Sequence, residues 1–122
     1  QLFSPAHAWL RMESERVAVV GISNHAQDEL GSIVYIELPQ VGEVFGAGEE
    51  LAVIESEKTA SALVVPVECT VLALNESVEK DPSLVNRAPE SEGWFARVEV
   101  RSPEALSPLL DADAYAALVG GA

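Results

Sequence analysis

The sequence predicts a single, mainly β domain with short helices, arranged as a sandwich or barrel. Its apolar runs are short, and turn signals separate them at intervals of about 8–12 residues, as in sandwiches and barrels. Two strand-like runs flank a polar turn at residues 55–59, which predicts a β-hairpin. A length of 122 residues suits one domain spanning 1–122, and an apolar content of 48% argues against disorder.

The expected strands are short runs of apolar and β-branched residues. They are His7–Glu13, Val17–Ile22, Ile33–Leu38, Leu51–Ile54, Ala60–Val65, Val71–Leu74 and Trp94–Val100. The first two are joined by a polar turn at 14–16, and Pro39 stops the pairing of the third. The last alternates, which predicts Trp94 and Ala96 on one face and Phe95 on the other.

Short helices are expected near residues 24–30 and toward the C-terminus. Asn24 is expected to cap the first helix, with Gln27 reaching back, and Gly31 to end it in a left-handed conformation. Ser102 is expected to cap a second helix that has Pro103 at its first position.

Two further segments complete the C-terminal half. A last helix is expected from about Asp113 to Val119. Residues 75–90 carry two prolines and many polar groups, so we expect a long surface loop with at most one helical turn.

The net charge of −13 restricts the class of partner. Twenty acidic residues face only seven lysines and arginines, so a phosphate backbone would be repelled and nucleic acid is a poor partner. The charge serves either solubility or steering toward basic surfaces of partner enzymes. No apolar run is long enough to span a bilayer, so no membrane partner is expected.

The residue types of metal and catalytic sites are sparse. His7 and His25 are far apart in the sequence and Cys69 is the only cysteine, so no metal-ligand spacing exists. Neither a nucleophile–base pair nor a phosphate-binding loop is recognisable. The single cysteine suits a reducing compartment.

Lys58 is one of two lysines, and it lies at the tip of the predicted hairpin. Such a lysine is exposed and offers an amine for covalent attachment; the ordinary alternative is a solubilising charge on a turn. The sequence around it, Glu55-Ser56-Glu57-Lys58-Thr59-Ala60, resembles the lysine motif of lipoyl-carrying proteins. This segment alone would fit a lipoyl domain of a 2-oxoacid dehydrogenase acyltransferase almost equally well.

Other blocks resemble the H proteins of the glycine cleavage system, in register from about Phe3 to Leu118. These blocks are Val20–Gly31, Ile33–Pro39, Leu84–Asn86, Glu92–Trp94 and Leu109–Tyr115. The resemblance implies a lipoyl-domain-like hammerhead β-sandwich that acts as a carrier and is not itself an enzyme. It also implies a bacterial cytoplasmic or mitochondrial matrix location.

The resemblance further implies lipoic acid on Lys58, attached by a lipoate ligase or lipoyltransferase that recognises Glu57. His25 is implied at the cleft that receives the loaded arm, and Ser61 lies in the same lysine pattern. The implied partners are a pyridoxal-phosphate glycine decarboxylase, a folate-dependent aminomethyltransferase and a flavin-containing dihydrolipoyl dehydrogenase. The arm would carry the aminomethyl group of glycine from the first to the second.

Two alternatives of other classes stay open. One is an H-like protein that relays lipoyl groups to other complexes without serving glycine cleavage. The other is a biotin carrier, which is disfavoured because the sole methionine, Met12, is far from Lys58.

Three positions depart from the pattern of the family. Ala8 and Ala62 replace carboxylates associated there with holding the charged arm, so weaker protection of the arm is expected unless Glu13 or Glu37 reaches the cleft. Cys69 replaces a turn glycine, so a strained turn with positive φ is one expectation and a reorganised turn with negative φ is the other.

Overall fold

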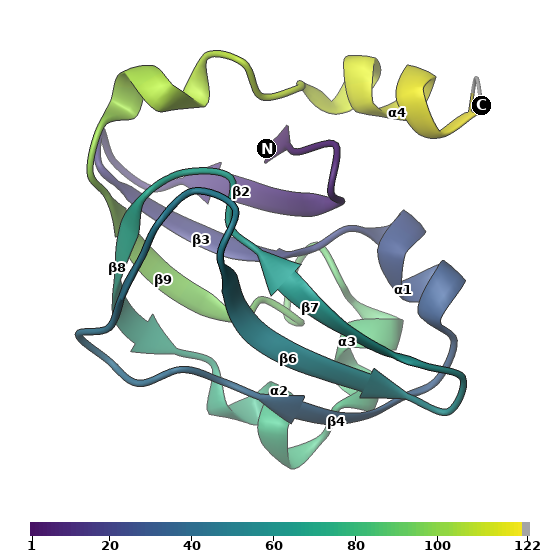
Figure 1. Cartoon of the computed structure of the whole chain (residues 1–122). Coiled ribbons are helices and arrows are strands. Elements are labelled where there is room, and N and C mark those ends of the chain that lie inside the picture. Colours follow the sequence, from purple (N-terminus) through teal and green to yellow (C-terminus); the bar gives the residue numbers. More distant parts are fainter. Residues whose placement is uncertain (121–122) are drawn as a thin grey trace.

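The computed structural model describes residues 1–120. Within them, nine strands form two antiparallel sheets (Figure 1). The larger sheet has the order β1 (Leu2–Phe3), β2 (Ala8–Met12), β3 (Val17–Ile22), β9 (Ala96–Val100), β8 (Cys69–Leu74) and β5 (Val44–Phe45). The smaller has the order β4 (Ile33–Glu37), β6 (Glu50–Ser56) and β7 (Ala60–Val64). The predicted β-sandwich is therefore confirmed.

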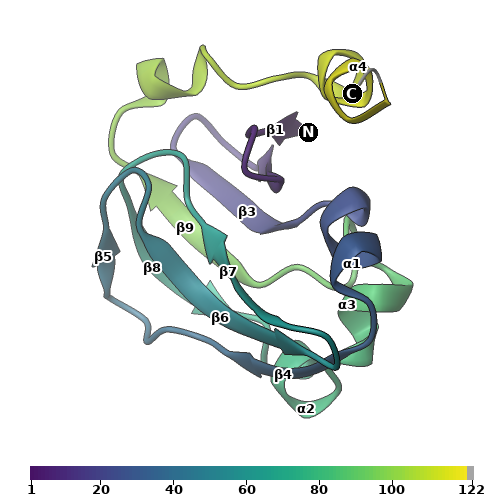
Figure 2. The ribbon, with the colours of Figure 1, turned by 45° about the vertical axis from the view of Figure 1, so that its right-hand side comes forward.

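The main hydrophobic core fills the space between the two sheets, which face each other in Figures 1 and 2. Alternation along the strands decides which side chains enter it. In β2, Ala8 and Leu10 join this core, whereas Trp9 points to the opposite face. There Trp9 packs with Phe3, Val19 and Tyr115 in a second cluster.

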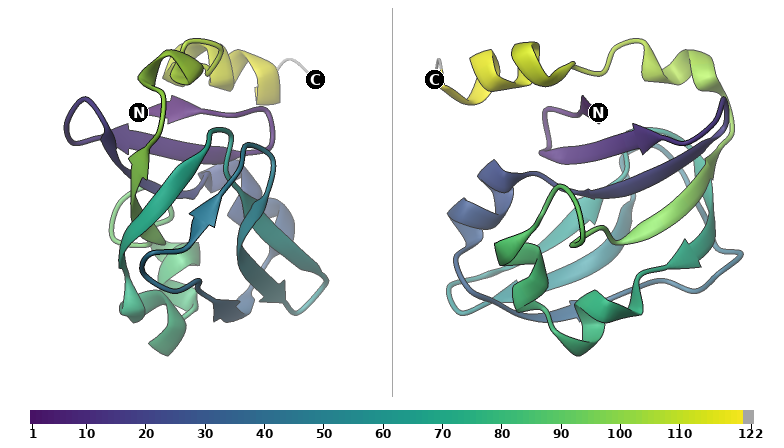
Figure 3. Two further views of the ribbon diagram at one scale, coloured as in Figure 1. Left: turned by 60° about the vertical axis from the view of Figure 1, so that its left-hand side comes forward. Right: turned by 180° about the vertical axis from the view of Figure 1, so that it is seen from behind.

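That second cluster lies under the C-terminal helix α4 (Ala112–Gly120), which contacts β1. Figure 3 shows this helix beyond the β1 edge of the larger sheet. Phe3 and Leu110 exchange backbone hydrogen bonds of 2.7 and 2.8 Å, and the rings of Phe3 and Tyr115 stack at 4.5 Å. The predicted last helix is confirmed, and its Tyr115 packs against Phe3 near the N-terminus.

The first helix, α1 (Asn24–Leu30), lies where it was predicted, but its cap differs. Ser23, not Asn24, is the N-cap, and its Oγ accepts the backbone N–H of Ala26 at 3.1 Å. Gln27 bonds the side chain of Asn24 instead of the cap. Gly31 ends the helix with φ +77° and ψ −154°, so its φ is positive but it lies outside the left-handed helical region.

Residues 75–90 are more ordered than predicted. They form two helices, α2 (Glu76–Lys80) and α3 (Ser83–Arg87), instead of a long loop. Val78 and Val85 are fully buried, one from each helix. The loop prediction was wrong because it rested on prolines and polar residues alone. The burial of these two valines in the core stabilises helices whose local helix propensity is weak.

Two predictions near the C-terminus need correction. Phe95 and Ala96 both join the main core, whereas Trp94 packs against the second cluster, so Ala96 does not share a face with Trp94 as predicted. The reason is that regular strand alternation begins only at Ala96, the first residue of β9. Pro103 does start a helix, but it is a 3₁₀ helix, Pro103–Leu106, in which the Ser102 side chain makes no capping bond.

Cys69 is not a turn residue. It is the first residue of β8, pairs with Val100 and Phe45, and is 1% exposed. His7 is the only non-glycine residue with positive φ among those described, so the strained-turn expectation for Cys69 is wrong. Because β8 begins at Cys69, this residue belongs to the sheet and not to a turn. A buried cysteine packs there as a small apolar side chain.

Candidate attachment site

The hairpin that carries Lys58 connects β6 to β7 in the smaller sheet, with Glu55 paired to Ala60. Ser56 organises its turn. The Ser56 Oγ accepts the backbone N–H groups of Lys58 at 3.2 Å and Thr59 at 3.1 Å. The backbone N–H of Ser56 donates to the Thr59 carbonyl at 2.8 Å. A serine hydroxyl that bonds successive backbone groups is a common way to stabilise a tight turn.

The tip is tied to the segment that follows α1. The backbone N–H of Glu57 donates to the carbonyl of Ser32 at 3.0 Å. Lys58 is exposed, and its stem lies on Gly31, where an added Cβ would come within 3.2 Å of Lys58 Cε. The predicted exposed tip is confirmed, but the Lys58 side chain rests on the α1–β4 connection.

Asn86 holds that connection in place. Its Nδ2 donates to the Gln27 side chain at 2.9 Å and to the Gly31 carbonyl at 2.8 Å, while its Oδ1 accepts from the backbone of Ile33 at 2.9 Å. One amide therefore joins α3, α1 and β4 beneath the lysine. Only the resemblance pointed to Asn86, because its partners are more than 50 residues away.

A cavity opens beside the hairpin, between β7 and α1. Its lining residues are Ala6, His7, Ile22, Ala26, Glu29, Leu30, Ile54, Ser61 and Ala62. Among these, Glu29 is the sole carboxylate. Glu13 is instead paired with Arg97, and Glu37 accepts from Tyr35, so neither acid considered from the sequence lines this cavity.

A second cavity adjoins the first and shares His7 and Glu29 with it. Its other lining residues are Pro5, His25, Leu118 and Val119. His25 therefore faces this second cavity, while Ser61 lines the first. Lys58 and Glu57 line neither of these two cavities, and they lie at the hairpin tip.

The two histidines meet despite their separation in sequence. Their ring centroids are 4.8 Å apart, and His25 Nε2 lies 2.9 Å from Glu29 Oε1. Burial and the neighbouring His25 lower the pKa of His7, with Glu29 acting in the opposite direction. The two histidines are thus neighbours in the fold although they are 18 positions apart in the sequence, so their sequence spacing was a poor guide to a shared site.

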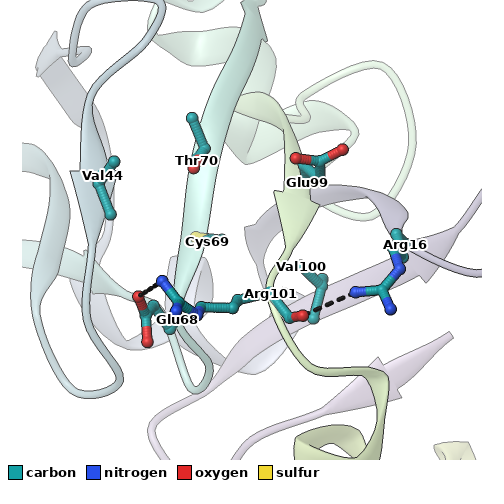
Figure 4. Close-up of a pocket in the computed structure, with 8 residues that line it drawn as sticks. All are labelled: Arg16, Val44, Glu68, Cys69, Thr70, Glu99, Val100 and Arg101. Carbon is teal, nitrogen blue, oxygen red and sulfur yellow. Dashed lines mark hydrogen bonds and ion pairs between the residues drawn. The ribbon is translucent and has the colours of Figure 1, made fainter.

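A third cavity lies at the start of β8, at the opposite end of the sandwich from the hairpin tip (Figures 1 and 4). Arg101 forms an ion pair with Glu68 at 3.3 Å, and the backbone carbonyl of Arg101 accepts a hydrogen bond from the Arg16 side chain at 2.7 Å. Figure 4 shows both contacts. The guanidinium groups of Arg16 and Arg101 therefore both have partners within the protein. Burial and the neighbouring Glu68 raise the pKa of Cys69 to about 11, so its thiol is a poor nucleophile.

Taken together, a β-sandwich with an exposed lysine on a braced hairpin, beside a small cavity, defines a carrier domain for a covalently attached group. The family model described as "Glycine cleavage H-protein" matches residues 1–121. The chain therefore belongs to the glycine cleavage H-protein family. Members of this family carry a lipoyl group and are not catalysts, so this chain is a lipoyl-carrying shuttle of the glycine cleavage system and not an enzyme.

Individual relatives agree with the family match. The chain is 44% identical over 117 residues to the glycine cleavage system H protein of Chromohalobacter salexigens, covering 96% of this chain and 89% of that protein. It is also 44% identical over 117 residues to that of Aeromonas salmonicida, with 96% and 91% covered. The crystal structure of the Mycobacterium marinum protein superposes with a TM-score of 0.87 at 30% identity, covering 98% and 95% of the two chains.

Within the described residues, no helix is long and apolar enough to cross a membrane.

Proposed function

We propose that Lys58 is the residue that carries the lipoyl group. The main support for this proposal is the structure of the hairpin. Ser56 orders the turn, the Glu57 backbone bonds the turn to Ser32, and Lys58 remains exposed. The other lysine, Lys80, lies in the last turn of α2, without paired strands on both sides. Lys58 alone therefore has the local structure of an attachment site among the two.

When bound, a lipoyl group supplies a disulfide that can accept a one-carbon amine fragment and electrons. The residues of this chain present and shield it. Glu57, exposed and next to Lys58, is the contact for a lipoate ligase or lipoyltransferase. Ser61 and Ala62 line the adjoining cavity on the β7 side, and His25 and Glu29 stand on the α1 side.

Glu29 supplies the carboxylate that holds the charged arm, in place of the carboxylates that are absent at Ala8 and Ala62. Ala8 is buried in the main core, so a cation in the cavity would face Glu29 instead. A charge-assisted hydrogen bond from an ammonium group to a carboxylate is worth roughly 1.5–3 kcal/mol. Glu29→Gln should therefore shorten the half-life of the aminomethyl-loaded protein, and Asp28→Asn, an exposed neighbour on α1, should leave it unchanged.

The partners follow from the glycine cleavage role. They are a pyridoxal-phosphate glycine decarboxylase, a folate-dependent aminomethyltransferase and a flavin-containing dihydrolipoyl dehydrogenase. The −13 charge supports approach to basic surfaces on these enzymes. The relatives named above are bacterial, which supports action in a bacterial cytoplasm.

Glycine–bicarbonate exchange by a glycine decarboxylase tests this function against the lipoate-relay alternative. The lipoylated protein should support exchange, and Lys58→Arg should not, whereas Lys80→Arg should match the parent chain. A lipoylated protein that donates its lipoyl group to other complexes but supports no exchange would favour the relay.

A further inference from the structure

Three metal-binding side chains converge beside the N-terminal turn, although they come from separate segments. His7 precedes β2, and His25 and Glu29 lie one turn apart on α1. One ligand atom from each lies within 4.8 Å of the others, and His25 Nε2 lies 2.9 Å from Glu29 Oε1.

The separation between His25 and Glu29 is near that of two ligands on one transition-metal ion, and His7 lies within 4.8 Å of both. Ligand atoms in a tetrahedral zinc site with bonds of roughly 2.0–2.1 Å are about 3.3 Å apart. The Glu29 side chain is 63% exposed, so it has room to adjust its rotamer toward an ion shared with the two imidazoles.

The His7 ring is oriented by hydrogen bonds that connect it to two buried side chains. His7 Nδ1 lies 2.7 Å from the Tyr115 hydroxyl, and that hydroxyl lies 2.6 Å from Ser23 Oγ. Tyr115 and Ser23 are both buried. Metal-binding imidazoles commonly use one ring nitrogen for such a partner, which leaves the other for the ion. Nε2 is then the free nitrogen of His7.

The backbone at His7 adds a second observation. His7 has φ +71°, a conformation that is strained for a non-glycine residue and that clusters at functional sites. Two hydrogen bonds hold it there, from His7 N–H to the Ser4 carbonyl and from Ser23 N–H to the His7 carbonyl, both 2.9 Å. The strained backbone places the ring beside His25.

We propose that His7, His25 and Glu29 form a binding site for a divalent transition-metal ion of the zinc class. Two imidazoles and one carboxylate suit such ions, whereas Mg²⁺ and Ca²⁺ prefer all-oxygen ligand sets. The three side chains line an open cavity, so an ion can enter and a fourth ligand position remains. The net charge of −13 favours the approach of a cation.

An ion at this site would stand next to the cavity proposed for the lipoyl arm, because His7 and Glu29 line both cavities. Zinc would therefore compete with an arm that rests there, and this consequence depends on the proposed function. Binding of the ion to the unmodified chain does not depend on it.

The test is calorimetric titration of chelator-treated, unlipoylated protein with Zn²⁺ alone, in a buffer that does not bind metals. We expect one ion per chain, displaced by a chelator but not by a tenfold excess of Mg²⁺. His25→Gln and Glu29→Gln should each weaken binding at least tenfold, and so should His7→Asn, since asparagine tolerates positive φ. Asp28→Asn is the matched control and should leave affinity within twofold.

Thermal unfolding followed by circular dichroism shows whether each variant is folded and supplies a second measurement. Zinc should raise the Tm of the parent chain and of Asp28→Asn, but not that of His25→Gln, which changes a partly exposed side chain on α1. Equal zinc affinity of the parent and a folded His25→Gln variant would overturn the proposal, and so would displacement of the ion by Mg²⁺.

Discussion

The side chain of Lys58 packs on Gly31, close enough that a Cβ at position 31 would lie 3.2 Å from Lys58 Cε. This contact joins the exposed hairpin to the end of α1. It makes Gly31 part of the surface on which the attachment lysine rests, in addition to its role in ending the helix.

Gly31→Ala should therefore both destabilise the protein and slow lipoylation. The backbone at φ +77° and ψ −154° is a conformation that essentially only glycine adopts, so a side chain there costs on the order of 1–3 kcal/mol. Gly42→Ala is the control, since Gly42 also has positive φ, +93°, and nothing lies near its Cβ position. Thermal melts should show that both variants are destabilised, and lipoylation assays should show a slower rate only for Gly31→Ala. Equal lipoylation rates for the two variants would show that the contact between Lys58 and Gly31 plays no part in attachment.

Gly21→Ala should destabilise more strongly, with no effect specific to the hairpin. Gly21 pairs with Trp9, and an added Cβ would lie 2.8 Å from the Trp9 indole. That ring is fully buried and donates to the Pro89 carbonyl at 2.9 Å, so it has little room to move. Overpacking of this kind costs typically about 1–3 kcal/mol.

Urea denaturation is the measurement for Gly21→Ala. Gly46→Ala provides the comparison, because its Cβ would meet only the flexible side chain of Glu49. A Gly21→Ala variant as stable as Gly46→Ala would show that the sheet relaxes around Trp9.

The Cys69 thiol should be inert in the native state. Burial and the neighbouring Glu68 raise its pKa to about 11 from an ordinary value of 9.0. The folded state thus holds the proton more tightly than the unfolded chain does. The stabilising contribution is complete below pH 9 and is lost as pH rises through 11.

Two measurements check this. Iodoacetamide at pH 8 should label Cys69 only after denaturation, and the decline in stability between pH 9 and 11 should be smaller in Cys69→Ala than in the parent. Rapid labelling of the folded protein would contradict the burial of the thiol.

Glu57→Ala should slow lipoylation and leave the Tm nearly unchanged. The Glu57 side chain is exposed, and the bond to Ser32 uses its backbone N–H, which alanine retains. Surface substitutions of this kind usually change stability by less than about 0.5 kcal/mol. Glu55→Ala is the matched control, an exposed acid in β6; equal lipoylation rates for the two variants would remove Glu57 from the recognition surface.

The hairpin could be predicted from sequence because its information is local. Polar turn residues between two apolar runs define β6 and β7, and the register follows from their short connection. The cap of α1 shifted from Asn24 to Ser23 because both side chains can cap, and helix boundaries are uncertain by one residue.

The cluster around His7 could not be predicted in the same way. His7 meets His25 only because α1 follows β3, and it meets Tyr115 only because α4 returns to β1. Contacts over 18 and 108 residues leave no periodic trace in the sequence. For the same reason Glu29, rather than Glu13 or Glu37, emerged as the acid of the cavity only from the fold.

The central claim is that Lys58 is the lipoyl attachment residue, and site-resolved mass spectrometry tests it most directly. After incubation with a lipoate ligase, we expect one lipoyl group per chain, located on Lys58. Lys58→Arg should take up none and Lys80→Arg should match the parent chain. A label on Lys80, or a label that survives Lys58→Arg, would contradict the account.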